Sequence, residues 1–169
     1  FPNDRLLAIG GAGIWWPGKD LGQVTDLSGN ARRFLHMEQR KEGVAMWAPV
    51  SGLYYSSTRM ELAALLLAAH ATIPVHIGVE NKAVVDKARI LQQRAIQLQA
   101  KGQLGSKRPL KKRWQLQCDG DLWEQYWNVL ISRGHLSIEV SKVKGHATDS
   151  QVAEGKVREE DKHGNDAAD

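Results

Sequence analysis

The chain is poor in cysteine and has no long hydrophobic run. Cys118 is the only cysteine among the 169 residues, which excludes an internal disulfide and a cysteine-rich zinc site. The longest apolar run, LAALLLAA at Leu62–Ala69, is far shorter than the roughly 20 residues that cross a bilayer. No basic segment followed by an apolar stretch opens the chain as a secretory leader would. We therefore expect an intracellular protein in a reducing compartment, with no membrane as a partner.

The sequence also lacks internal repeats and low-complexity tracts. Its length suits one domain with a core of its own, and 42% hydrophobic and 25% charged residues are ordinary values for a globular protein. The net charge of +4 and the pI of about 9.3 hint at a polyanionic partner. Positive charge gathers in KRPLKKRWQ at Lys107–Gln115, whereas Asp149–Asp169 is mixed and acidic.

The first third of the chain predicts strands. AIGGAGIWWPG at Ala8–Gly18 is typical of a strand that Pro-Gly ends. RRFLHMEQR and GVAMWAPVSGLYYSS predict two further strands with irregular breaks. Three strands in succession favour an antiparallel meander.

Helical patterns begin after these strands. Ser57 or Thr58 can cap a helix, and Glu61, three residues after Thr58, fits a capping box. Leu62–Ala69 is apolar on all sides, as in a buried helix. VHIGVE at Val75–Glu80 predicts a short buried strand, and Asn81 can cap the helix that follows. The expected buried face of that helix is Val84, Ala88, Leu91, Ala95 and Leu98.

The last third adds two helices and a strand. Asp119 or Asp121 begins a helix whose apolar face includes Trp123 and Trp127, which we expect in the core. HLSIEVSKV predicts a strand, a long polar loop follows, and GNDAAD fits the first turn of a last helix capped by Asn165. The order of elements predicts an α/β fold with one mixed sheet, antiparallel strands first and parallel strands after, and helices on both faces.

Three carboxylates lie at the ends of predicted elements. Glu61 is in the first turn of the apolar helix, Glu80 ends a buried strand, and Asp169 is in the last helix. Functional groups in α/β sheets collect at the carboxyl ends of strands, so the three can meet at one rim. Clustered carboxylates repel one another unless cations are present, and oxygen ligands suit Mg²⁺ or Mn²⁺. Taken singly, each carboxylate also fits a plainer role, compensating a helix dipole or facing solvent.

Five motifs resemble ribonuclease H domains and occur in the same order. They are STRMELAALLLAA, VENKAVVDK, GDLWEQYWNVL, VSKVKGHA and GNDAAD. GGAGIWWPG and DKHGNDAAD look most like the domains of eukaryotic retroelement reverse transcriptases. The resemblance covers about Ala8–Asp169, so residues 1–169 are expected to form a single RNase H-like domain, truncated at both ends. It implies that the first strand of the family lies upstream of residue 1.

The resemblance also implies a reaction and a set of catalytic residues. The family hydrolyses the RNA strand of RNA–DNA hybrids with two divalent ions, Mg²⁺ or Mn²⁺. By motif, Glu61 would hold a metal ion and orient the attacking water, and Glu80 and Asp169 would complete the metal ligands. His146 in KGHA would assist proton transfer or product release, a role that suits an imidazole. Without its motif, His146 would favour the plainer interpretation of a solvated loop histidine.

Substrate contacts follow from the same alignment of motifs. Ser57, Thr58 and Arg59 match positions that touch the minor groove of the hybrid and its 2′-hydroxyls, and Asn81 and Lys82 match a second contact. The basic segment resembles the protrusion with which cellular RNases H hold the DNA strand, through Lys111, Lys112, Arg113 and Trp114. The plainer alternative for this segment is a solvated linker. The implied partners are an RNA–DNA hybrid and an upstream polymerase domain.

The sequence departs from the family at two carboxylates. The family's first strand ends in an aspartate that bridges both metals, and no such strand is present; Asp4 fits a loop residue. Glu80 stands where the family has aspartate, which moves the carboxylate by about 1.5 Å against a metal shell with little tolerance. These departures favour the alternative of a catalytically decayed domain that binds nucleic acid or packs on a polymerase. A different nuclease or a transposase of the same fold lacks support, because TRMEL and KVKGHA point to RNase H itself.

Overall fold

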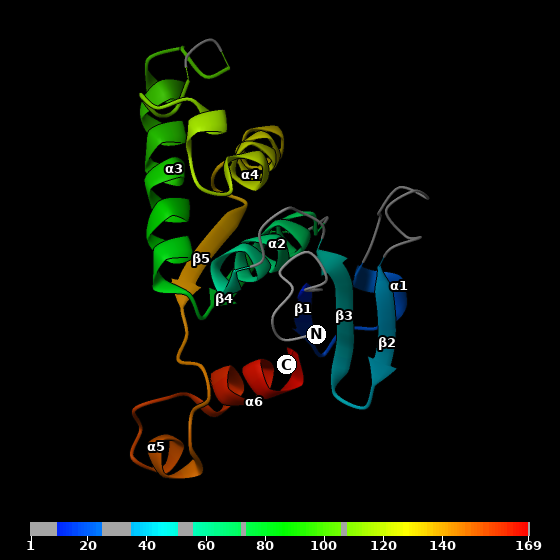
Figure 1. The fold of residues 1–169 in the computed structure, drawn as a ribbon. Coiled ribbons are helices and arrows are strands. Elements are labelled where there is room, and N and C mark those ends of the chain that lie inside the picture. The colour runs from blue at the N-terminus through cyan, green and yellow to red at the C-terminus, as the bar shows by residue number, and fades with distance from the viewer. Residues whose placement is uncertain (1–9, 25–34, 51–55, 72–73, 106–107, 169) are drawn as a thin grey trace, which may run out of the picture.

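The computed structural model describes residues 10–24, 35–50, 56–71, 74–105 and 108–168 (Figure 1). Three strands, β1 (Gly10–Pro17), β2 (His36–Arg40) and β3 (Gly43–Val50), form an antiparallel sheet in the order β1-β3-β2. A short helix, α1 (Leu21–Val24), follows β1. The antiparallel pairing agrees with the sequence, but the order is not that of a meander. The strand β3 is central because Gly43, Val44, Ala45 and Met46 are buried, whereas β2 is mostly exposed.

A second, parallel sheet joins β4 (Val75–Val79) to β5 (Ile138–Lys142). The α/β class is therefore confirmed, whereas the single mixed sheet expected from the sequence is not found among the described residues. There the chain forms two sheets, because no described strand lies between β1 and β4. Helix α2 (Ser57–Ala69) contacts both of these strands and bridges the sheets.

Four longer helices and a 3₁₀ turn complete the part of the chain that the structure describes. Helix α3 (Lys82–Ala100) packs on β5, and α4 (Gly120–Arg133) packs on α2. A 3₁₀ turn, η2 (Trp114–Leu116), precedes α4. After β5, α5 (Asp149–Ala153) and α6 (Glu159–Ala168) occupy the stretch that the sequence predicts to be a loop. None of the helices in the described residues is long and apolar enough to cross a membrane.

The helix caps confirm one sequence prediction and correct two. Asn81 caps α3 by accepting from the backbone N–H groups of Ala83 and Val84, as expected. Helix α2 is capped by Ser56, not by Ser57 or Thr58, because the Ser56 hydroxyl accepts from Arg59 N at 3.1 Å. Glu61 therefore lies beyond the first turn. Asn165 lies inside α6 instead of capping it.

The core forms where the helices meet the sheets. All five residues predicted for the buried face of α3 are buried, and so are Trp123 and Trp127 of α4 and both Ile138 and Val140 of β5. Residues of β1 alternate between two layers, as strand geometry requires. Ala12 packs toward α2, whereas the Trp15 ring contacts His163 of α6 with ring centroids 5.8 Å apart. Helices α2 and α6 thus cover opposite faces of β1.

Candidate active site and nucleic-acid interface

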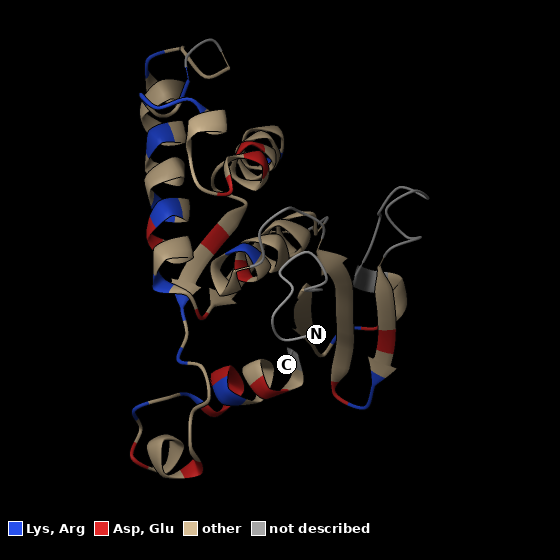
Figure 2. Ribbon diagram, viewed as in Figure 1, with Lys and Arg blue, Asp and Glu red and all other residues tan. Residues whose placement is uncertain are grey.

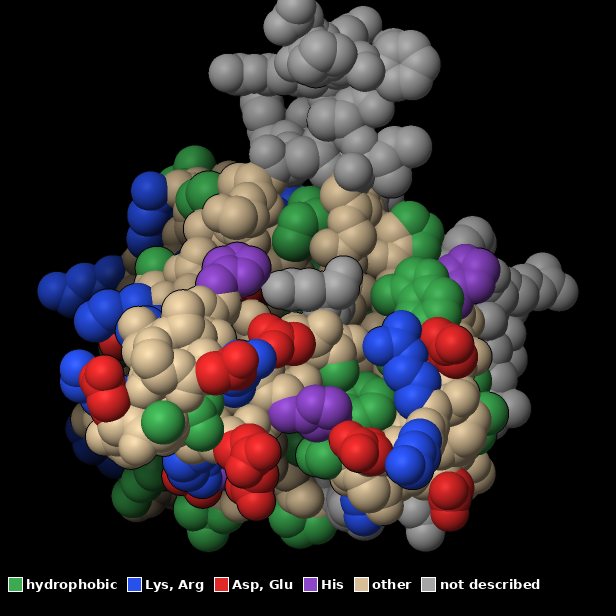
Figure 3. Space-filling model, turned by 90° about the horizontal axis from the view of Figure 1, so that it is seen from below, with side chains coloured by type: hydrophobic (Ala, Val, Ile, Leu, Met, Phe, Trp, Pro, Cys, Tyr) green, Lys and Arg blue, Asp and Glu red, His purple; other side chains and the backbone are tan. Residues whose placement is uncertain are grey.

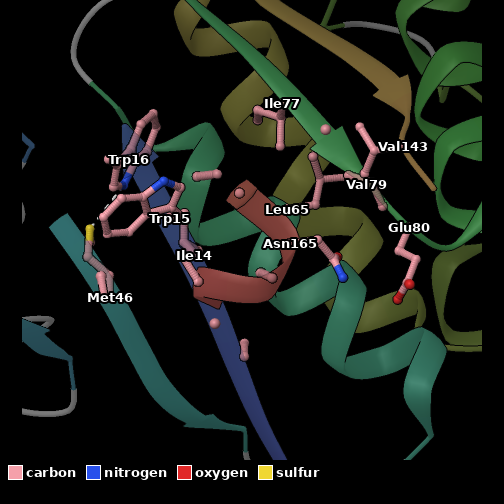
Figure 4. Close-up of a pocket in the computed structure, with 18 of the residues that line it drawn as sticks. Ile14, Trp15, Trp16, Met46, Leu65, Ile77, Val79, Glu80, Val143 and Asn165 are labelled. Atoms are coloured by element: carbon pink, nitrogen blue, oxygen red, sulfur yellow. Dashed lines mark hydrogen bonds between the residues drawn. The ribbon is translucent and has the colours of Figure 1, made fainter. Parts of the chain in front are cut away.

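A cavity of about 980 Å³ lies where β1, α2, β4 and α6 come together (Figure 4). Ser57 and Glu61 line it from α2, and Glu80 lines it from the position directly after β4. Two of the three carboxylates predicted as metal ligands therefore share one cavity. They do so because the first turns of α2 and the carboxyl end of β4 are adjacent, which sequence spacing alone does not reveal.

The loop that carries His146 packs directly against Glu80. A Cβ added to Gly145 would lie 0.7 Å from Glu80 Oε1, so the Glu80 carboxylate rests on the Gly145 backbone. His146 follows at once, with an exposed side chain and a φ of 48°, in the left-handed region that few residues other than glycine adopt. The histidine loop and Glu80 are thus neighbours, although Gly145 follows Glu80 by 65 positions in the sequence.

Asp169, the third predicted carboxylate, lies outside the described residues. Among the residues that are described, no group of three or more His, Cys, Asp or Glu side chains is placed to hold a metal ion. Glu61 and Glu80 supply oxygen donors of the type that Mg²⁺ prefers, but as a pair they fall short of such a group.

Helix α6 contributes polar groups to the cavity that the sequence analysis assigned to a loop or a cap. Glu160, Asp161 and Asn165 all line it. The Asn165 side chain points toward Glu80 (Figure 4), and its Nδ2 is buried without an acceptor. Figure 3 shows the molecule from below, and acidic side chains are spread across the middle of the surface seen there. For Glu160 and Asp161, the signal in the sequence was the acidic run Glu159–Asp161.

Two predicted substrate contacts lie beside Glu80 and are joined to each other. Asn81 Nδ2 donates to Thr58 Oγ1 at 3.1 Å, which ties the start of α2 to the start of α3. Both side chains are half-buried, and Ser57 is exposed at the same helix end. Lys82 is exposed and pairs with Asp86. These four residues form one surface next to the cavity.

Arg59 does not belong to that surface. It is 8% exposed, and its guanidinium contacts Asp119 at 3.0 Å and Asp121 at 2.7 Å. The hydrogen bonds from Arg59 hold the pKa of Asp121 below its usual range, and the pKa of Arg59 is raised in turn. The prediction that Arg59 contacts the groove of the hybrid is therefore wrong, because the Arg59 guanidinium is paired with two aspartates at the start of α4.

The basic segment divides into exposed cations and a buried tryptophan. Lys111, Lys112 and Arg113 are exposed, whereas Trp114 is 8% exposed and belongs to the core. Trp114 is therefore an anchor and not a surface on which bases stack, which corrects the expectation from the resemblance. Hydrogen bonds hold the segment at both ends, from Arg94 Nε to Pro109 O at 3.1 Å and from Gln117 Nε2 to Lys112 O at 2.9 Å.

Charge is distributed unevenly over the elements. Lys and Arg follow one another along α3 and the connection after it, whereas Asp and Glu concentrate on α5 and α6 (Figure 2). Lys87 of α3 is half-buried with its Nζ 4.7 Å from the centre of the Trp123 ring, and burial lowers its pKa. The sequence analysis did not single out Lys87, because its contact with Trp123 exists only in the fold.

Comparison of the chain with protein-family models, curated proteins and solved structures found no significant match.

Proposed function

We propose that this chain is a ribonuclease H domain of a retroelement reverse transcriptase and that it hydrolyses the RNA strand of RNA–DNA hybrids. The observation that carries the proposal is that Glu61 and Glu80 line one cavity. The loop that presents His146 packs against the second of them. The five ordered motifs support the same reaction, and the implied partners are a hybrid and an upstream polymerase domain.

The proposal assigns the metal ligands to carboxylates. Glu61 and Glu80 would hold Mg²⁺ or Mn²⁺ through oxygen atoms, and the resemblance assigns Asp169 as the further ligand. Two bound ions would activate the attacking water and stabilise the leaving 3′ oxygen. Glu61 would orient that water toward the phosphorus, and His146 would transfer a proton or assist product release.

The surface next to the cavity suits the proposed substrate. Ser57, Thr58 and Asn81 present hydroxyl and amide groups that can hydrogen-bond with 2′-hydroxyls, the groups that distinguish RNA from DNA. Lys111, Lys112 and Arg113 would contact the phosphates of the DNA strand. Because Trp114 and the two hydrogen bonds fix the segment, these cations would be held in place before the hybrid binds.

A second candidate function is a binding module without catalysis. It is favoured by the absence, among the described residues, of any three His, Cys, Asp or Glu side chains grouped to hold a metal. It is also favoured by Glu80, which is longer than the aspartate of the family. In this case the same surface would hold the hybrid or pack on a polymerase without cleaving RNA.

The experiment that separates the two candidates measures cleavage and binding together. The 169-residue chain, and the same chain extended by its native upstream residues, would be incubated with a labelled RNA–DNA hybrid and Mg²⁺ or Mn²⁺. We expect cleavage that Glu61→Gln abolishes, because the amide removes a negative ligand, whereas binding measured by anisotropy stays close to the parent value. Glu139→Gln is the matched control, since Glu139 is exposed and does not line the cavity.

Two results would contradict the nuclease. Equal cleavage by Glu61→Gln and its parent would show that the catalytic site has been assigned wrongly. Tight binding without cleavage by either form of the chain, with both metals, would instead establish the binding module.

A further inference from the structure

The outer face of the antiparallel sheet carries two stacked rings that are open to solvent. Trp47 of β3 is 41% exposed, and the exposed His36 lies opposite it on β2. Their ring centroids are 5.7 Å apart and the ring planes differ by 15°. Tryptophan is highly buried on average because its apolar area is costly to expose. An exposed, nearly parallel stack therefore makes this face a candidate binding surface.

The strand on the other side of Trp47 provides no side chain next to its ring. Residues directly opposite one another on one face of a sheet stand about 4.5–5.5 Å apart, so His36 covers one side of the indole. On the other side the register pairs Trp47 with Gly13 of β1, which has no side chain. A flat ring placed over Gly13 would thus extend the stack by one layer.

Small residues shape a hollow around this position. Gly13, Trp15, Ala45 and Trp47 share the outer face of the sheet and all line the cavity; we call this part of the cavity the outer hollow. It lies on the face of β1 that α6 partly covers. There a Cβ added to Gly164 would lie 3.7 Å from Trp15 Cδ1, so the helix borders the hollow closely without filling it.

Two charged side chains of β2 border the outer hollow. Glu38 and Arg40 share the face of His36, because residues two positions apart in a strand point the same way, and both line the cavity. They pair at 3.2 Å, and Arg40 Nη1 also donates to Ala167 O at 3.3 Å. The carboxylate can accept from an amino group and the guanidinium can donate to a ring nitrogen. Because the pair is neutral as a whole and β3 has no charged residue (Figure 2), this face would not repel a phosphate.

A purine ring matches these groups better than other flat or apolar ligands do. It stacks on tryptophan through its π-face, and its edge carries ring nitrogens and exocyclic groups that form hydrogen bonds. An aliphatic side chain would use the rings alone, and a phosphate would use Arg40 alone.

We propose that the His36–Trp47 stack and the outer hollow bind a purine ring, supplied by a free nucleotide or by a base of a single-stranded nucleic acid. The ring lies over Gly13 against the open side of Trp47, with its polar edge toward Glu38 and Arg40. The proposal goes beyond the proposed function, because neither metal ions nor cleavage of a hybrid take part.

The test titrates the 169-residue chain with AMP, with a short oligoadenylate and with an abasic strand of the same length, all in EDTA. We expect the NMR signal of the Trp47 indole N–H to shift with AMP at up to about 10 mM. Binding of the oligoadenylate at least about tenfold tighter than AMP identifies a base within a strand as the ligand, and equal binding identifies a free nucleotide. The abasic strand keeps the phosphates and should bind at least about fivefold more weakly than the oligoadenylate.

A set of variants locates the binding. Trp47→Leu keeps apolar bulk without a π-face and should weaken binding of the oligoadenylate at least about fivefold, whereas Trp47→Tyr should retain most of it. Leu136→Ala is the control, since Leu136 is 82% exposed and does not line the cavity. Unchanged binding by Trp47→Leu, or equal affinity for the abasic strand and the oligoadenylate, would overturn the proposal. So would a Trp47 signal that shifts with neither AMP nor the oligoadenylate.

Discussion

The backbone of Gly145 lies directly against the Glu80 carboxylate in the candidate active site. The Glu80 carboxylate lies where a side chain at position 145 would begin. The position of that carboxylate is therefore set by a residue from a distant loop, in addition to its own place after β4. The Glu80 side chain occupies room at the end of β4 that the missing side chain of Gly145 leaves open.

We predict that Gly145→Ala lowers the rate of RNA cleavage by at least about 100-fold, because a Cβ 0.7 Å from Glu80 Oε1 must displace that carboxylate, and a displacement of only about 1 Å at a catalytic group already has an effect of that size. The added methyl would move the end of a flexible side chain and not the backbone, so the free energy of unfolding should change by less than about 1 kcal/mol. Cleavage kinetics and urea denaturation measure the two effects. Gly22→Ala is the control, since a Cβ there meets no atom within 4 Å. Full activity of Gly145→Ala would show that cleavage tolerates a displaced Glu80.

At the scale of elements, one ionic contact joins α2 to α4. Arg59 lies on the helix that carries Glu61, and its partners Asp119 and Asp121 lie at the start of α4. The side chains of Arg59 and Asp119 are 10% and 9% exposed, so Asp119 would be a buried carboxylate without a cation if Arg59 were absent, whereas Arg59 also pairs with Asp121. The contact fixes the end of α2 that faces the cavity.

We predict that Arg59→Ala destabilises the protein by about 3–5 kcal/mol, because it leaves the buried carboxylate of Asp119 without a cation and with only the weak hydrogen bond from the Cys118 thiol. Lys156→Ala serves as the comparison. It breaks a pair with Glu154 in which both side chains are more than half exposed, and it should cost less than about 1 kcal/mol. Chemical denaturation followed by circular dichroism measures both. Similar small values for the two variants would show that the buried contact adds nothing beyond an ordinary surface pair.

At the scale of the whole molecule, positive and negative charge occupy different regions (Figure 2). The exposed cations of α3 and the basic segment lie away from the acidic helices α5 and α6. A nucleic acid is expected to bind along the positive region, because its phosphates are repelled by the acidic one. The net charge of +4 understates this preference, since the two regions partly cancel in the sum.

We predict that replacing Lys111, Lys112 and Arg113 by alanine weakens binding of an RNA–DNA hybrid and flattens its salt dependence. Each lost phosphate contact should reduce the slope of log K against log salt by about 0.7–0.9. Titrations at several salt concentrations measure it. Replacing Lys156 and Arg158 by alanine removes two exposed cations near the acidic helices and should leave the slope unchanged. An unaltered slope in the triple variant would identify the basic segment as a linker.

The sequence by itself determined the local structure of this protein. Periodicity identified α3 and its buried face, Asn81 identified its start, and the apolar run VHIGV identified β4 with Glu80 at its end. These features depend on neighbours in the chain, so the pattern of residues is sufficient to predict them. Motif order also identified Glu61 and Glu80 as candidates.

Tertiary structure alone decided which distant groups meet. It placed Glu61 and Glu80 in one cavity, set Gly145 against Glu80, and assigned Arg59 and Trp114 to the interior, where the sequence predicted surface contacts. It also made β3 the central strand and, within the described residues, left β1 and β4 in separate sheets. The physical reason is that burial and strand pairing depend on contacts between segments far apart in the chain, whereas caps, turns and periodicity depend on residues within a few positions.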